Sequence, residues 1–99
     1  MKTERDGAKT TFFAKGRIDA NHAQHFSAVL EKALEGTSEF VLDFSGVEYI
    51  SSSGLRAIMR AVKTMDRQGS MRIVNVSDEM YDLLEMTSFT GITEIERAE

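Results

Sequence analysis

The sequence contains no cysteine, no proline and no tryptophan, and its apolar runs are only a few residues long. Without cysteine the chain has no disulfide framework, no thiolate zinc site and no cysteine nucleophile. Without proline, glycine and short polar residues must mark the turns. Because a helix needs about 20 consecutive apolar residues to span a bilayer, we expect no membrane insertion.

Positive charge is also scarce. The 99 residues carry 12 Lys and Arg against 16 Asp and Glu, which gives a net charge of -4. Binding to a nucleic-acid backbone needs a basic face, so we expect no direct nucleic-acid contact. The first six residues lack the apolar segment of a secretory signal. We therefore expect a soluble, cytoplasmic protein in which residues 1–99 form one domain.

Short apolar segments alternate with segments of helical periodicity along most of the chain. The pattern predicts strands at 2–5, 9–14 (ended by Gly16), 40–44, 71–76 and about 91–95, and a loop at 45–53. It also predicts three helices. The first runs from Asp19 or Asn21 to Gly36, the second from 52–54 to 68, and the third begins at Ser77 or Asp78. Strands that alternate with helices imply parallel crossovers. The predicted fold class is therefore α/β, with a mixed, mostly parallel sheet of four to five strands and helices after the strands.

Two strand-to-helix loops are the candidate functional regions, because such loops meet at the carboxyl edge of a parallel sheet. They are Gly16–His22 and Ser45–Gly54. The second contains Ser51, Ser52 and Ser53 followed by Gly54, at the predicted start of a helix. A phosphate there would meet free backbone N–H groups and the positive end of the helix dipole. The simpler alternative is that one serine only caps the helix.

The segment from Val41 to Leu55, VLDFSGVEYISSSGL, resembles the signature of STAS domains, and in particular of anti-sigma factor antagonists. Segments 16–20, 73–76 and 83–89 resemble the family's earlier turn, later strand and last helix, so the similarity covers nearly the whole chain. One position departs from the pattern: Ser51 stands where many phosphorylated members have Asp.

The resemblance implies a phosphorylation switch and no catalysis by this chain. An anti-sigma factor that is also a serine kinase would phosphorylate Ser53, the residue before the Gly, with ATP bound by that partner; this chain itself would hold no cofactor and no metal. The unphosphorylated form would bind the anti-sigma factor and free a sigma factor, and a PP2C-like phosphatase would reset the switch. The expected partner-binding residues are Asp19, Ser51, Ser52, Ser53, Gly54, Arg56 and Arg60.

Other functions compete with this hypothesis. A STAS module can also serve as a non-phosphorylated subunit of a transporter or of another signalling assembly. A serine hydrolase is disfavoured, because Ser51 stands where the G-x-S-x-G nucleophile motif requires a glycine. A phosphorelay receiver would use Asp43 at the end of its strand, but the acidic pair and the late lysine that a receiver needs are missing from the pattern.

A metal site is the last alternative. His22 and His25 lie three residues apart on the first predicted helix, and Asp19 stands one turn before His22. Residues at this spacing share one face of a helix, so they form a weak candidate metal face. We expect instead that one histidine packs near the start of the helix and that the other is exposed.

Overall fold

The computed structural model describes residues 1–98. Five strands, three α-helices and one 3-10 turn follow each other along this part of the chain. Their bounds are β1 Lys2–Asp6, β2 Lys9–Ile18, α1 Ala23–Leu34, β3 Glu39–Ile50, α2 Ser52–Gln68, β4 Ser70–Val76, α3 Asp78–Met86, η1 Phe89–Gly91 and β5 Glu94–Arg97. The predicted α/β class and the alternation of strands and helices are confirmed.

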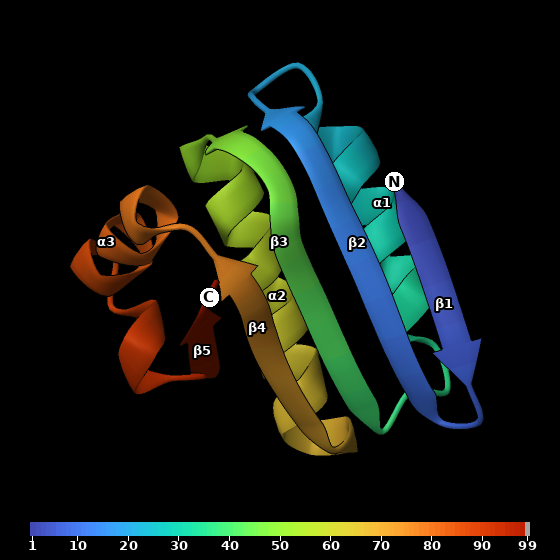
Figure 1. Cartoon of the computed structure of the whole chain (residues 1–99). Helices are drawn as coiled ribbons and strands as arrows, with labels where there is room; N and C mark the ends of the chain where they lie inside the picture. Colours follow the sequence, from blue (N-terminus) through green and yellow to red (C-terminus); the bar gives the residue numbers. More distant parts are fainter. Residues whose placement is uncertain (99) are drawn as a thin grey trace.

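The five strands form one sheet in the order β1-β2-β3-β4-β5 (Figure 1). β1 and β2 form an antiparallel hairpin, and the other neighbouring pairs are parallel. The hairpin turns at Gly7, whose φ of 62° is in the left-handed region that glycine adopts without steric cost. The sheet is therefore mixed and mostly parallel, as predicted.

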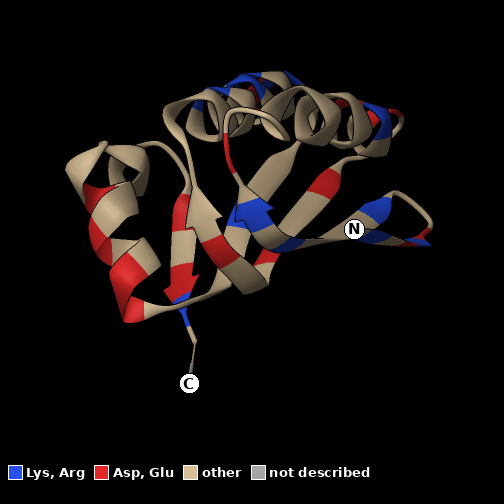
Figure 2. Cartoon of the chain, turned by 90° about the horizontal axis from the view of Figure 1, so that it is seen from above, with Lys and Arg blue, Asp and Glu red and all other residues tan. Residues whose placement is uncertain are grey.

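Helices α1 and α2 cover one face of the sheet, and α3 lies at its far edge beside β5 (Figures 1 and 2). The covered face holds the core, in which Phe12 of β2 lies edge-on to Phe26 of α1 with ring centroids 6.1 Å apart. Phe40 and Leu42 of β3 are fully buried in the same cluster. None of the helices within residues 1–98 is long and apolar enough to cross a membrane.

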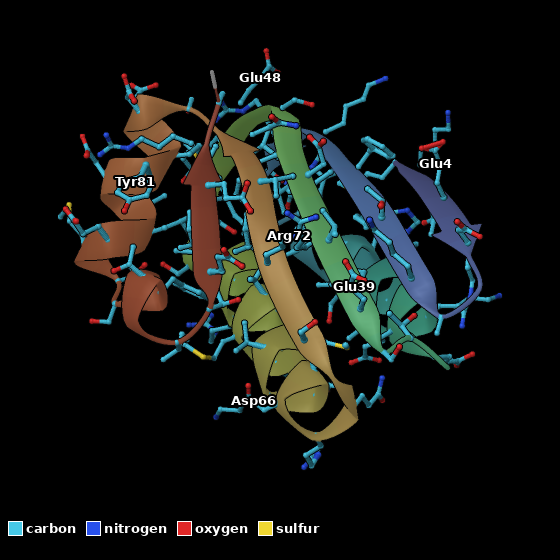
Figure 3. All side chains as sticks on the ribbon, turned by 60° about the horizontal axis from the view of Figure 1, so that its bottom comes forward. Glu4, Glu39, Glu48, Asp66, Arg72 and Tyr81 are labelled. Atoms are coloured by element: carbon cyan, nitrogen blue, oxygen red, sulfur yellow. The ribbon has the colours of Figure 1, made fainter. Side chains whose placement is uncertain are left out.

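β3 is the central strand, and each residue from Phe40 to Phe44 is buried, including the polar Asp43. The face opposite the helices carries charged side chains, among them Glu39 of β3 and Arg72 of β4, which are labelled in Figure 3. Arg72 forms an ion pair with Glu96 of β5 at 3.0 Å. This face of the sheet has no helix packed on it (Figure 1).

Two sequence predictions about the carboxyl edge of the sheet are wrong. β2 does not end at Gly16 but continues to Ile18, and most of the predicted 45–53 loop is strand, since β3 runs to Ile50. The two extensions pair with each other through two register shifts, and Gly16 has a φ of 78° there. Each extension supplies the backbone partners of the other, so residues typical of turns are held in a ladder.

The pairing of β3 with β4 ends earlier, at Asp43 and Val74. Beyond this point β2 and β3 continue without β4. The two candidate loops are therefore carried at the end of a two-stranded extension. The length of this extension places the two loops beyond the core of the sheet.

Candidate functional site

The structure brings the two predicted loops together at one edge of the sheet. The backbone N–H of Ser51 donates to the carbonyl of Ile18 at 2.8 Å, which ties the start of α2 to the end of β2. Gly54 packs directly beneath this link. A Cβ at Gly54 would lie 2.7 Å from Ile50 Cγ1 and 3.0 Å from Ile18 Cγ2, so a larger residue would force α2 away from the strands.

Ser51 is the N-cap of α2. Its backbone is extended, and its hydroxyl oxygen accepts a hydrogen bond from the N–H of Gly54 at 3.2 Å. This satisfies one of the unpaired donors in the first turn. The cap also explains the departure from the family pattern, because Ser and Asp perform this capping role about equally well.

Ser53 lies in the first turn of α2 and is half-buried, while Ser52 beside it is exposed. The Ser53 hydroxyl oxygen accepts a hydrogen bond from Arg56 Nη2 at 3.3 Å. A guanidinium stays protonated at any physiological pH, so Arg56 cannot remove the serine proton. The contact therefore gives Ser53 an electropositive neighbour but no general base.

Ser53 opens into a groove between α1 and α2 with a volume of about 470 Å³. Arg56 and Arg60 line it from α2, while Ala20 and the polar residues Gln24, Ser27 and Glu31 line it from the preceding turn and α1. Arg60 reaches across the groove, where its Nη2 donates to Ser27 Oγ at 2.8 Å. The structure thus brings together Ser53, Arg56 and Arg60, three of the predicted site residues.

Asp19 lies in the neighbouring turn, but its carboxylate bonds within that turn. Its Oδ1 lies 2.7 Å from His22 Nδ1 and accepts from the backbone N–H groups of Asn21 and His22. The hydrogen bond with the His22 side chain is the main reason that the pKa of Asp19 lies below its usual range. Asp19 caps the entry to α1 in part, as predicted, although the N-cap residue itself is His22.

The suggested metal face does not bring its three residues together. His22 pairs with Asp19, whereas His25 lines a separate hollow beside β1 and β2. Both histidines are exposed, which differs from the expectation that one of them packs near the start of the helix. Within residues 1–98, no group of three His, Cys, Asp or Glu side chains has the placement needed to hold a metal ion.

A buried carboxylate near the site was not predicted as a functional group. Asp43 is 7% exposed, at the point where β3 and β4 separate. Its Oδ2 accepts from Asn75 Nδ2 and its Oδ1 from the backbone N–H of Ser45, both at 2.8 Å. Burial opposes ionisation, but these hydrogen bonds outweigh it and hold the pKa of Asp43 below its usual range.

Two further features of the site were not predicted from the sequence: the α1 side of the groove and a surface contact at the end of the extension. In the sequence, the polar side of an amphipathic helix contains Gln24, Ser27 and Glu31, and nothing in that pattern indicates that they line a groove with Arg60. The Arg17 guanidinium lies 4.6 Å from the centre of the Tyr49 ring, where the two extended strands pair. Neither contact has a local sequence signal, because each depends on two segments that are distant along the chain.

The sequence and the fold are those of a known family. The model of the STAS domain matches residues 1–99, and the chain belongs to that family. A curated relative, the anti-sigma-B factor antagonist of Listeria monocytogenes, is 32% identical over 99 residues, which cover 97% of this chain and 86% of the relative. The resemblance seen in the sequence is thereby confirmed.

Solved structures share the fold at lower identity. A STAS domain protein from Planctomyces limnophilus has a TM-score of 0.87 and 16% identity, with 99% of this chain and 90% of that chain covered. The anti-sigma factor antagonist SpoIIAA in its unphosphorylated form has a TM-score of 0.76 and 15% identity, with 99% and 88% covered. A sulfate transporter family protein from Wolinella succinogenes has a TM-score of 0.75 and 19% identity, with 90% and 76% covered. The fold alone therefore does not choose between signalling and transport.

Proposed function

We propose that this chain, as a single STAS domain over residues 1–99, is an anti-sigma factor antagonist controlled by phosphorylation of Ser53. With Ser53 unmodified it binds an anti-sigma factor and frees a sigma factor, and with Ser53 phosphorylated it releases the anti-sigma factor. The observation that carries the proposal is the placement of Ser53 in the first turn of α2, open to a groove. The 32% identity to a protein named anti-sigma-B factor antagonist supports it.

The chemistry requires only a hydroxyl from this chain. The Ser53 oxygen attacks the γ-phosphorus of an ATP bound by the partner kinase, and the bond from that phosphorus to the β–γ bridging oxygen breaks. ADP leaves, and the serine proton passes to a base on the partner, because Arg56 cannot accept it. A PP2C-like phosphatase restores the switch by hydrolysis, which returns Ser53 and inorganic phosphate. The chain is then a substrate in the cytoplasm rather than an enzyme.

The fold should tolerate the modification. A phosphoserine carries about -1.5 to -2 charges. Negative charge near a helix N-terminus stabilises it by about 0.3–1 kcal/mol, and the first turn of α2 contains no acidic residue that would repel the phosphate. The switch therefore acts on the partner interface rather than on the folding of this chain.

The partner face extends outward from Ser53 over the two loops and α2. Ser52, Arg56 and Arg60 are exposed, and Ser51 and Asp19 are half-buried beside them. Gly54 is buried, so its role is to keep α2 close to Ile50 and Ile18 rather than to touch a partner. Together these residues present hydroxyls and two guanidinium groups at one edge of the sheet.

The alternative function is a non-phosphorylated STAS subunit of a transporter or of another assembly. It predicts that Ser53 stays unmodified and that the partner is a membrane protein. A serine hydrolase predicts esterase activity that disappears in Ser53→Ala. Both alternatives are separated from our proposal by one experiment.

That experiment measures intact mass after incubation with the cognate anti-sigma kinase and MgATP. We expect one added phosphoryl group on the wild-type protein and on Ser52→Ala, the matched control, and none on Ser53→Ala. An unchanged wild-type mass, with a kinase that is active on another substrate, would overturn the proposal. Addition that persists in Ser53→Ala would reject Ser53 as the acceptor.

A further inference from the structure

The groove beside Ser53 has an unusual charge arrangement. Arg56 and Arg60 lie one turn apart on α2, so two like charges are neighbours on the surface of the helix. Arg56 stands just after the first turn of α2 and Arg60 at its middle, so neither lies in the last turn, where the helix dipole would favour positive charge. Within residues 1–98, neither guanidinium has a carboxylate within 4.0 Å. Their side-chain hydrogen-bond partners are neutral hydroxyls, those of Ser53 and Ser27.

Helix geometry directs both arginines toward Ser53. Positions three and seven residues after Ser53 fall on the same face of α2, one and two turns away. Side chains of a helix lean toward its N-terminus, which is the end that carries Ser53. The Arg56 guanidinium already reaches the Ser53 hydroxyl, and Arg60 lines the same groove. Gln24 and Glu31 of α1 also line it, and Glu31 is its one acidic group.

We propose that this groove is an internal receptor for the phosphate on Ser53, in which Arg56 and Arg60 bind the phosphate of the same chain. Arg56 keeps its place beside the Ser53 oxygen, and Arg60 exchanges the Ser27 hydroxyl for a phosphate oxygen. Two guanidinium groups match a phosphate dianion in charge and in hydrogen-bond donors. The inference rests on the proposed function, because it assumes that Ser53 becomes phosphorylated.

The receptor changes what phosphorylation does to the partner face. If the phosphate stays in the groove, the modification withdraws two positive charges from that face in addition to placing an anion there. A partner that reads the unmodified form would present carboxylates to Arg56 and Arg60. The unphosphorylated double variant Arg56→Gln/Arg60→Gln should then bind the anti-sigma factor at least about tenfold more weakly than wild type.

The decisive test uses protein with phosphoserine encoded at position 53 during translation, so no kinase is needed. The second pKa of the phosphate, about 6 for free phosphoserine, is measured by phosphorus NMR titration. Nearby positive charge favours the dianion, so we expect the pKa in the wild-type chain to be lowered by about half a unit or more. Arg56→Gln and Arg60→Gln should each restore part of the shift, whereas Arg67→Gln, in the last turn of α2, should not.

Each outcome decides the inference. A pKa that stays near 6 in the wild-type chain overturns the receptor. So does a lowered pKa that neither arginine variant changes, because the helix terminus alone would then account for it. A shift that depends on Arg56 and not on Arg60 rejects the two-arginine receptor. Failure of the kinase to modify Ser53 would instead contradict the proposed function and leave this titration unaffected.

Discussion

Two strand-to-helix junctions lie at the same edge of the sheet, β3 to α2 and β4 to α3. Both helices begin with a serine N-cap, and Ser51 and Ser77 each accept a hydrogen bond at 3.2 Å from the N–H three residues later. The next two residues differ. α3 continues with Asp78 and Glu79, while α2 continues with Ser52 and Ser53. One junction thus has fixed negative charge where the other has hydroxyls.

The charges along the two helices are also opposite. Every charged residue of α3 is acidic, whereas α2 carries four basic residues and one acidic residue. Figure 2 shows red segments along α3 and blue segments on the helices above the sheet. Because Ser53 occupies the same place in its helix as Glu79, the proposed phosphorylation would give α2 the anion that α3 has permanently. The β4–α3 junction therefore serves as a reference for the proposed switch.

The largest expected difference between the junctions is in partner binding. Ser53→Asp places a carboxylate at the switch position and should weaken binding of the cognate anti-sigma factor about 100-fold, which corresponds to about 3 kcal/mol. The matched variant Glu79→Gln should leave the affinity within about twofold. Calorimetric titration of both variants measures this, with thermal melts as the folding control. An unchanged affinity, or a collapsed melt for Ser53→Asp, would contradict the switch.

The second prediction concerns the bond that joins the two strands before the junctions diverge. Asp43→Asn replaces a carboxylate that accepts from Asn75 and from Ser45. Hydrogen bonds to a charged group contribute about 1.5–3 kcal/mol, so unfolding in urea at pH 7 should show a loss of that order. Asp66→Asn is the control, because Asp66 is exposed on α2 (Figure 3). Equal stabilities of the two variants would show that Asp43 does not stabilise the point where β3 and β4 separate.

The difference in stability between wild type and Asp43→Asn should also depend on pH. Folding lowers the pKa of Asp43, so its ionised form is favoured in the folded state. The stability it contributes is fully present above the unfolded value of about 3.9 and is lost as the pH falls through the lowered folded value. The difference between wild type and Asp43→Asn should therefore be constant from pH 7 to about 5 and shrink below about 4. A difference that grows on acidification would reverse the sign and reject this account.

The sequence predicted the helix start at the β3–α2 junction better than the shape of the junction. Ser53 and Gly54 were placed at this helix start because serine caps and a family motif are local signals. The strand from Ser45 to Ile50 was missed because it opens with Ser45 and Gly46, which are typical of turns, and its pairing with the end of β2 has no local signal. Ser27 was missed because its place in the groove depends on how α1 packs against α2. Local signals locate a candidate group, but contacts between distant segments determine what surrounds it.

The serine caps should contribute equally at the two junctions. Ser51→Ala and Ser77→Ala each remove an acceptor for a first-turn N–H, and each should lower the free energy of unfolding by about 1 kcal/mol. Ser51→Asp should keep the wild-type stability, because Asp also caps well. Urea denaturation of the three variants measures this. If Ser51→Asp is as unstable as Ser51→Ala, the capping explanation of this family position is wrong.

The smallest effect is the electrostatic one, and it tests whether the two helix starts are equivalent. Ser53→Asp should raise the free energy of unfolding by about 0.3–1 kcal/mol, and Glu79→Gln should lower it by a similar amount. Both effects should weaken in 1 M salt, where the screening length falls to about 3 Å. Urea midpoints at low and high salt measure them. If Ser53→Asp instead destabilises the fold at low salt, the groove of Arg56 and Arg60 does not favour an anion, and phosphorylation would act by disturbing α2 rather than by changing the partner face.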